Sequence, residues 1–372
     1  MTSTARSIRE DAPPAPATAA PAFDAAKAQA FAGRMLGAIN DAAFVLMTSV
    51  GHRTGLFAAL AGISPCTAAA LAAHTGLAER YVREWLAVMV TARAVTYAPD
   101  DTTYHLPAEH AAFLTAGGPV NIAISTQFLG VVAGVEDEIV ARFTDGKGTH
   151  YHHYGRFHAV MAEVSDEAVV SKLVDHILPL VPEMTGRLES GIDVIDAGCG
   201  AGKALLELAR RFPRSRFTGF DLCPDAFAGT QDTARAEGIT NLAFRAADLS
   251  GLDHFGACDL AFAFDAVHDQ RDPARMLRAV RASLRPAGAF LMVDIGGSSH
   301  LERNLDHPVG SHLYMMSCMH CTPVSLGQGG PGLGAMWGVE LAERMLGEAG
   351  FGKVAISRLP HDIVNAYFVA RP

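Results

Sequence analysis

Two adjacent polar residues in the C-terminal half of the chain could move a proton. His268 and Asp269 lie in the segment FDAVHDQRDPARML, which follows an apolar run typical of a buried strand. Histidine titrates near neutral pH and suits proton removal from a hydroxyl or thiol. We therefore predict that His268 is a catalytic base or positions a reactant, with Asp269 beside it. The alternative is that Asp269 or Asp272 caps the next helix and His268 only packs.

A glycine-rich loop lies upstream of this pair. In DAGCGAG, Asp196 is followed by glycine at every second position, Gly198, Gly200 and Gly202. Glycine lets a backbone turn sharply and approach a ligand closely. Asp221 ends the next predicted strand, where a carboxylate can bind both hydroxyls of a ribose. The spacing predicts a site for a ligand that contains a nucleoside.

Two nucleoside cofactors compete for this loop. A nicotinamide dinucleotide motif would have glycine at position 203, where this chain has Lys203, and would place a pyrophosphate at the helix N-terminus. The leading DAGCG and a predicted closing hairpin favour S-adenosylmethionine, which has no phosphate. A purely structural glycine turn would leave Asp221, and Asp248 at the end of the third strand, unexplained. We predict S-adenosylmethionine as the cofactor.

The stretch GTHYHHYGRFHAV, residues 148–160, is rich in histidine. A metal site needs three or four converging ligands, and an extended chain would turn His153 away from His150 and His152. We expect these three histidines to be solvated and predict no metal. The end of the stretch enters a helix toward the cofactor strand, so we predict that Tyr154 presents its ring to a sulfonium and that Phe157, His158 and Met161 contact ligand.

A second candidate lining of the acceptor site is SHLYMMSCMHCTPVSLGQGGPGLGAMWG, between the fifth predicted strand and the last helix. Its methionines and aromatics suit an apolar small molecule. The substrate-binding residues predicted here are Tyr314, Met319, His320 and Trp337. Cys318 and Cys321 do not have a zinc-finger spacing, so no metal is expected here either.

The elements that must position these residues form three zones. From residue 191 onward, strands and helices alternate, which predicts an α/β Rossmann-like domain with a seven-stranded sheet. Residues 23–115 look mostly helical and end in AVTYAPDDTTYHL, the pattern of a winged helix that serves in dimerisation or as a lid. Residues 116–190 are predicted as a helical connector, and residues 1–22, rich in Ala and Pro, as a disordered tail.

Composition limits the partners. The formal net charge is −9, and residues 24–115 have six positive and seven negative side chains, which disfavours binding to nucleic acid. No uninterrupted apolar run reaches the roughly 18–20 residues of a membrane span. Six cysteines in so long a chain do not indicate a disulfide framework. We expect a cytoplasmic protein that does not bind membranes.

Residues 191–372 resemble class I S-adenosylmethionine-dependent methyltransferases through DAGCGAG, GFDL, AADL, LRPAGAFLMVDI and the closing hairpin. With the winged helix, the chain is similar to mycobacterial two-domain methyltransferases and, more loosely, to small-molecule O-methyltransferases. Many of the latter have tryptophan after the Asp of the His-Asp pair, whereas this chain has Gln270. The resemblance implies a role in cofactor binding for four groups of residues. The glycine loop would follow the methionine part of the cofactor, through Asp196, Gly198, Cys199, Gly200 and Gly202. Asp221 and Leu222 would lie at the ribose, Asp248 and Leu249 at the adenine, and Phe264 and Asp265 near the sulfonium.

Together these features predict methyl transfer to an oxygen, sulfur or nitrogen of a small molecule, with a thiol, phenol or hydroxy compound favoured. We also expect a homodimer formed through the N-terminal domain. One alternative is a transcription regulator whose winged helix binds DNA and whose methyltransferase-like domain senses a ligand. Another is methylation of RNA or protein, and the acidic chain disfavours RNA.

Overall fold

The computed structural model describes residues 22–372, so the predicted tail lies almost entirely outside the described residues. The chain divides into two compact units, residues 1–43 and 44–372. Helix α1 (Ala25–Arg53) begins in the first unit and ends in the second. By length and composition alone α1 could cross a membrane, because it has 29 residues and its charged residues are few. The 18-residue window that meets this test is not buried.

The winged-helix region forms as predicted. Its helices are α2 (Leu56–Gly62), α3 (Ala68–Thr75), α4 (Glu79–Thr91) and α5 (Ala108–Leu114), and its wing is the hairpin of β1 (Thr96–Ala98) and β2 (Thr103–His105). Thr67 caps α3 by accepting the Ala70 N–H at 3.2 Å. Trp85 of α4 lies in the core of this region, where its indole N–H donates to the Met47 carbonyl at 2.9 Å.

The connector is helical with short irregular turns. It contains α6 (Gln127–Ala133), α7 (Glu136–Asp145), the 3₁₀ turn η1 (Tyr151–His153), α8 (Phe157–Ala168), the turns η2 (Val170–Lys172), η3 (Leu173–Ile177) and η4 (Leu178–Leu180), and α9 (Pro182–Ser190). Lys203 forms an ion pair with Asp166 of α8. This pair ties α8 to the helix that follows the glycine loop.

The seven predicted strands form one sheet in the order β5-β4-β3-β6-β7-β9-β8. They are β3 (Asp193–Ala197), β4 (Arg216–Asp221), β5 (Leu242–Ala246), β6 (Cys258–Phe264), β7 (Leu284–Ile295), β8 (Lys353–Ser357) and β9 (Asn365–Arg371). The first five are parallel, and β9 runs antiparallel to both β7 and β8. β7 spans the whole segment LRPAGAFLMVDI, from Leu284 to Ile295.

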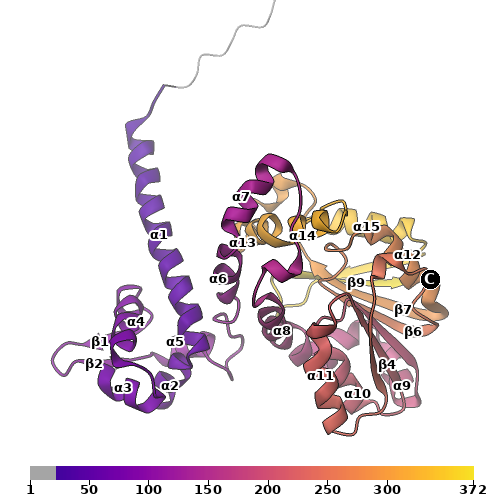
Figure 1. The fold of residues 1–372 in the computed structure, drawn as a ribbon, viewed down its shortest axis with the longest axis horizontal. Helices are drawn as coiled ribbons and strands as arrows, with labels where there is room; N and C mark the ends of the chain where they lie inside the picture. Colours follow the sequence, from indigo (N-terminus) through magenta and orange to yellow (C-terminus); the bar gives the residue numbers. More distant parts are fainter. Residues whose placement is uncertain (1–21) are drawn as a thin grey trace, which may run out of the picture. The chain divides into compact units, whose positions relative to one another are not determined.

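Helices cover both faces of this sheet (Figure 1). They are α10 (Lys203–Arg211), α11 (Pro224–Ala236), α12 (Pro273–Ser283) and α15 (Val339–Glu348). Strand β6 is buried on both sides: Ala261 packs in the cluster with α12 and α15, and Leu260 and Phe262 pack in the cluster with α9 and α10. A strand covered on both faces is expected to be apolar throughout, as CDLAFAF nearly is.

The segment between β7 and α15 folds as η6 (Leu301–Asn304), α13 (Gly310–Met316), the π-helical turn η7 (Ser317–Cys321) and α14 (Thr322–Gly327). It packs backbone to backbone on the histidine-rich stretch, since the Thr149 N–H donates to the Pro323 carbonyl at 2.8 Å. A Cβ at Gly148 would lie 1.8 Å from the Gly327 nitrogen, so this approach requires glycine. The two segments predicted to line the acceptor site therefore lie together.

Candidate active site

His268 is held between two carboxylates. It lies in the loop after β6, and its Nδ1 is 2.7 Å from Oδ1 of Asp294, near the end of β7. Its Nε2 is 3.4 Å from Oδ1 of Asp269. Burial lowers the pKa of His268, but Asp294 and Asp269 outweigh it, and the pKa lies well above its usual value. These carboxylates stabilise the imidazolium that would form when His268 takes up a proton.

Asp294 is fixed in turn by two further donors. Its Oδ1 accepts the Trp337 indole N–H at 3.0 Å and the Ile295 backbone N–H at 2.8 Å, and the side chain is fully buried. A carboxylate with three donors on one oxygen has little freedom to turn, so it orients the His268 ring. Trp337 was predicted to bind substrate, whereas in the structure its indole N–H donates a hydrogen bond to Asp294.

Asp269 contacts residues from both lining segments. Tyr151 donates its hydroxyl to Asp269 Oδ2 at 3.3 Å, and His320 Nδ1 lies 3.9 Å from the same oxygen. Burial, followed by the Asp269 and Asp221 carboxylates, raises the pKa of Tyr151 well above its usual value, so the phenol stays protonated. Asp272, and not Asp269, caps α12 by accepting the Arg275 N–H at 2.9 Å. The side chain of Asp269 thus remains available to the site.

His320 is the most enclosed of these groups. Its ring stacks on Phe157 at a centroid distance of 3.6 Å and meets the edge of Tyr154 at 4.7 Å. Burial, with His268 and His158 nearby, lowers the pKa of His320 well below its usual value. Neither ring nitrogen has a hydrogen-bond partner within residues 22–372, although the side chain is fully buried. Such a buried polar ring calls for an explanation.

The glycine loop approaches the next strand and the loop after β6. Asp221 accepts the Gly200 N–H at 2.8 Å and the Cys223 N–H at 2.9 Å, so its carboxylate fixes the loop. Gly198 has φ +86°, and a Cβ there would lie 2.4 Å from the Cβ of Ala266. The glycine loop therefore packs against Ala266, which precedes His268 by two positions in the sequence. This approach is expected where parallel strands end at one edge of a sheet.

Asp196 is a buried carboxyl at the start of this loop. It is 1% exposed, and its Oδ1 has no hydrogen-bond partner among the described residues. Burial, and secondarily the Asp221 carboxylate, raise the pKa of Asp196 to about 7. An unmet acceptor at the base of an open glycine loop fits a ligand that carries an ammonium group.

We predict that Asp196 makes the ligand-free protein less stable as pH rises. The pKa is about 7 in the folded chain and about 3.9 when unfolded, so the folded chain holds more protons between these values and its free energy of unfolding falls across that window. Asp196→Asn should flatten the fall in melting temperature measured from about pH 5 to about pH 8. Parallel curves for Asp196→Asn and the native protein would contradict this.

The other predicted cofactor residues lie at the same edge of the sheet. Asp248 accepts the Ser250 N–H at 3.0 Å and pairs with Arg271 at 2.9 Å. Leu249 is buried, whereas Leu222 is 45% exposed. Phe264 stacks on Phe262. Asp265 has a left-handed backbone with φ +49°, which is strained for a residue other than glycine. Burial, followed by Asp294, raises its pKa well above the usual value.

The remaining predicted residues divide between the interior and the surface. Tyr154 is buried, and its hydroxyl donates to the Met319 carbonyl at 2.7 Å, so it joins the two lining segments. His158 is partly buried 5.4 Å from the Tyr151 ring, and burial lowers its pKa. Met161 and Met319 are partly buried against the same apolar cluster as Phe157, while the Tyr314 hydroxyl accepts from Asn304 at 2.9 Å. His150, His152 and His153 are exposed, as the sequence predicted.

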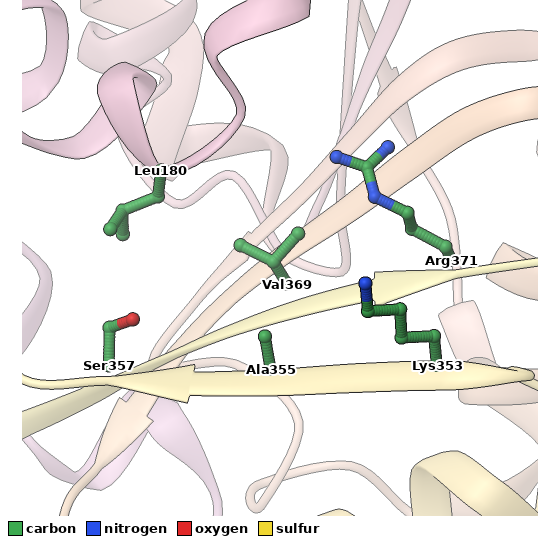
Figure 2. Close-up of a pocket in the computed structure, with 6 residues that line it drawn as sticks. All are labelled: Leu180, Lys353, Ala355, Ser357, Val369 and Arg371. Atoms are coloured by element: carbon green, nitrogen blue, oxygen red, sulfur yellow. The ribbon is translucent and has the colours of Figure 1, made fainter.

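A cavity of about 200 Å³ lies elsewhere, beside the edge strand β8 and its neighbour β9 (Figure 2). Leu180, Lys353 and Arg371 are among the residues that line it. None of the predicted site residues does so. The chemistry of the His268 group makes that group the better candidate for the active site.

Sequence reasoning missed three residues of this site. Asp294 appeared only within a predicted strand, and Tyr154 instead of Tyr151 was predicted to contact the ligand. Cys321, which lies within 4.8 Å of ligand atoms of His268 and Asp269, was considered only in a zinc-finger pattern. An acid near the end of a buried strand was the one available signal, and it would have identified Asp294. Tyr151 and Cys321 reach the site only through the packing of two segments distant in sequence.

Comparison with protein families supports the two-part organisation. Residues 42–116 match the Rv2258c-like winged HTH domain, and residues 188–343 match a methyltransferase domain. The chain is 30% identical over 112 residues to trans-aconitate 2-methyltransferase of Deinococcus radiodurans. The aligned region covers 30% of this chain and 41% of that protein. The chain spans less than half the length of the curated relatives that it matches.

Solved structures match over nearly the whole chain. Human N-acetylserotonin methyltransferase, solved with S-adenosylmethionine, is 18% identical with a TM-score of 0.62, over 91% of this chain and 97% of that one. The mitomycin 7-O-methyltransferase MmcR is 17% identical with a TM-score of 0.63, over 93% of this chain and 100% of that one. These identities show a shared fold. The chain thus joins a region that matches an Rv2258c-like winged HTH domain to a region that matches a methyltransferase domain, and its fold is that of the methyltransferases among these solved structures.

Proposed function

We propose that this protein transfers a methyl group from S-adenosylmethionine to an oxygen, sulfur or nitrogen of a small molecule, with a thiol, phenol or hydroxy compound favoured. The observation that supports this best is the buried line of Asp294, His268 and Asp269 beside the glycine loop. Two proteins of similar fold, N-acetylserotonin methyltransferase and mitomycin 7-O-methyltransferase, have names that specify small-molecule acceptors, which supports a small acceptor here. A screen of small thiols, phenols, hydroxy acids and amines, monitored by product mass, tests the proposal.

Residues of the glycine edge would hold the cofactor. Asp196 offers an unmet carboxyl oxygen for its ammonium group, the loop at Gly200 is open, and Asp221 is placed for the ribose. When bound, S-adenosylmethionine supplies an electrophilic methyl group on a sulfonium. Asp248 with Leu249 would lie at the adenine, as the order of strand ends implies.

His268 would act on the acceptor. Asp294 fixes Nδ1 as a donor, so Nε2 is the nitrogen that exchanges a proton with the acceptor. The raised pKa makes the ring a stronger base, and once Nε2 has released its own proton its lone pair can take the proton of a hydroxyl or thiol. Asp294 and Asp269 then stabilise the imidazolium. Tyr151 holds Asp269 in place, and the largely buried surroundings exclude water. In-line attack by an oriented acceptor obtains much of its rate from this positioning.

The transcription-regulator alternative receives less support. A DNA-reading helix needs free cationic side chains. Both arginines on α4 that could contact phosphates are paired within the helix, Arg80 with Glu84 and Arg83 with Glu79. Salt-sensitive binding to promoter DNA at sub-micromolar concentration would restore that alternative.

We also propose that a second copy of the chain covers α1. Phe31, Met35 and Ile39 follow at intervals of four residues, which places them on one helix face, and they are 60%, 47% and 62% exposed. An apolar stripe of this kind on a long helix indicates an interface between protein chains.

We expect Phe31→Asp combined with Ile39→Asp to convert a dimer to a monomer, because two charges would be buried in the interface. Light scattering after size-exclusion chromatography measures the mass. Phe143→Asp is the control, since Phe143 is 79% exposed on α7 and should leave the mass unchanged. An identical mass for the double variant and the native chain would refute the interface.

A further inference from the structure

Three metal-ligand side chains meet beside the free nitrogen of His268. A ring nitrogen of His268, an oxygen of Asp269 and the sulfur of Cys321 all lie within 4.8 Å of one another, and all three residues are buried. His268 Nε2 and Asp269 Oδ1 are 3.4 Å apart. Bonds of about 2.0–2.3 Å in a tetrahedral site place ligand atoms about 3.3–3.8 Å apart. The spacing of the first two ligands therefore already fits a shared ion.

The hydrogen bonds of these residues leave room for a cation. Because Nδ1 of His268 donates to Asp294, Nε2 is an acceptor when the ring is neutral and a donor when it is charged. It faces Asp269 Oδ1, a buried acceptor with no hydrogen-bond partner in the part of the chain that the structure describes. Two acceptors face each other stably only when a proton or a metal ion lies between them.

The surroundings of His268 have the pattern of a metal-binding histidine. Such histidines usually donate their other ring N–H to a carboxylate, which fixes the tautomer and the ring orientation. Asp294 fills that position at 2.7 Å, and Trp337 and the Ile295 N–H fix Asp294.

His320 gives a separate indication of a ligand. It is fully buried, both of its ring nitrogens are unpartnered among residues 22–372, and Nδ1 points to within 3.9 Å of Asp269 Oδ2. It precedes Cys321 on the π-helical turn η7, a rare conformation found often at functional sites. Neutral imidazole beside a thiol and a carboxyl is a donor set that suits zinc.

We propose that His268, Asp269 and Cys321 bind a divalent ion of the zinc class, with a further coordination position open to the methyl acceptor. This departs from the expectation of no metal, because these ligands are too far apart in sequence for a recognisable zinc motif. The choice of acceptor rests on the proposed methyl transfer: if that function holds, a bound zinc ion favours a small thiol among the possible acceptors. Thiolate is a soft ligand that zinc prefers.

The chemistry balances without an oxidant or a reductant. A thiol acceptor loses its proton to solvent as its sulfur binds the ion. The acceptor sulfur then forms a bond to the methyl carbon while the bond from that carbon to the sulfonium breaks, which leaves a methyl thioether and S-adenosylhomocysteine. In this form His268 is a ligand that positions the ion, and it does not receive the proton.

Cobalt(II) is the probe that tests the site. The full-length protein is treated with a chelator, dialysed and titrated with Co²⁺. We expect one equivalent to bind, with the intense visible bands of four-coordinate cobalt and a thiolate-to-cobalt band in the near ultraviolet, and we expect Zn²⁺ to bleach both. Failure to bind one equivalent, or a spectrum without the thiolate band, overturns the proposal.

Two variants and a control assign the ligands. Cys321→Ser should remove the thiolate band, whereas Cys318→Ser should keep it, because Cys318 lies on the same turn but is exposed. Asp294→Asn leaves the three ligands in place and should weaken Co²⁺ binding about 10- to 100-fold. A thiolate band that survives Cys321→Ser refutes the assignment, and unchanged S-adenosylmethionine affinity shows that this variant is folded.

Activity assays separate this inference from the proposed function. The chelated and zinc-loaded proteins are each supplied with S-adenosylmethionine and the screened acceptors. Methyl transfer to a thiol by the zinc-loaded form alone supports the metal site. Equal transfer by both forms, without cobalt binding, refutes the metal and leaves methyl transfer intact. Cobalt binding without transfer to any acceptor by either form refutes the proposed function instead.

Discussion

Replacing His268 with alanine should lower kcat by about 100-fold or more while the affinity for S-adenosylmethionine stays nearly unchanged. Under both proposals the imidazole serves the acceptor, as a base or as a ligand of the ion, and it does not hold the glycine loop, which is fixed through Asp221 and the Phe220 carbonyl. The loss should therefore appear at saturating cofactor. Single-turnover rates and calorimetric titration of the cofactor measure the two quantities separately.

The design must separate chemistry from folding. His268→Gln can still donate to Asp294, so it should fold like the native chain yet lose activity to a similar degree. His152→Ala is the matched control, because His152 is an exposed histidine on η1. Near-native turnover of both His268 variants would contradict any role of this residue at the acceptor.

Much of the fold follows from local sequence patterns. Apolar runs such as DVIDA and CDLAFAF predict buried parallel strands, and both form. The glycines of DAGCGAG mark a tight loop, and Gly198, Gly200 and Gly202 all have positive φ. Asp221 could be placed at this loop because parallel strands end at a common edge.

The acceptor side could be predicted only in part. His268 and Asp269 stood out because two ionisable residues follow a buried strand. The partner that fixes His268 lies near the end of β7, and the pairing of β6 with β7 is a tertiary fact. Tyr151 and Tyr154 are close in one segment, and the sequence analysis predicted that Tyr154 faces the ligand. In the structure Tyr154 donates to the Met319 carbonyl, whereas Tyr151 donates to Asp269. Both contacts join segments that are distant in sequence, so the sequence alone does not show them.

Asp221→Ala should weaken S-adenosylmethionine binding about 10- to 100-fold, which corresponds to the loss of charge-assisted hydrogen bonds. Two effects combine in this loss. The carboxylate would no longer bind the ribose, and the Gly200 and Cys223 N–H groups would lose their acceptor, which loosens the loop. At saturating cofactor kcat should recover most of its native value, because the proposed role of Asp221 is in binding and not in the proton transfer.

Titration calorimetry with S-adenosylmethionine and S-adenosylhomocysteine measures this loss without turnover. Asp221→Asn keeps a side-chain oxygen that can accept one of the two loop N–H groups, so its affinity should fall between those of the native chain and Asp221→Ala. Asp225→Ala is the control, because Asp225 is an exposed acid in the first turn of α11. Native affinity in Asp221→Ala would place the ribose elsewhere. Of these two aspartates, Asp221 is the one that contacts the glycine loop. Equal losses in Asp221→Ala and Asp225→Ala would therefore mean that net charge, and not the position of Asp221, governs cofactor binding.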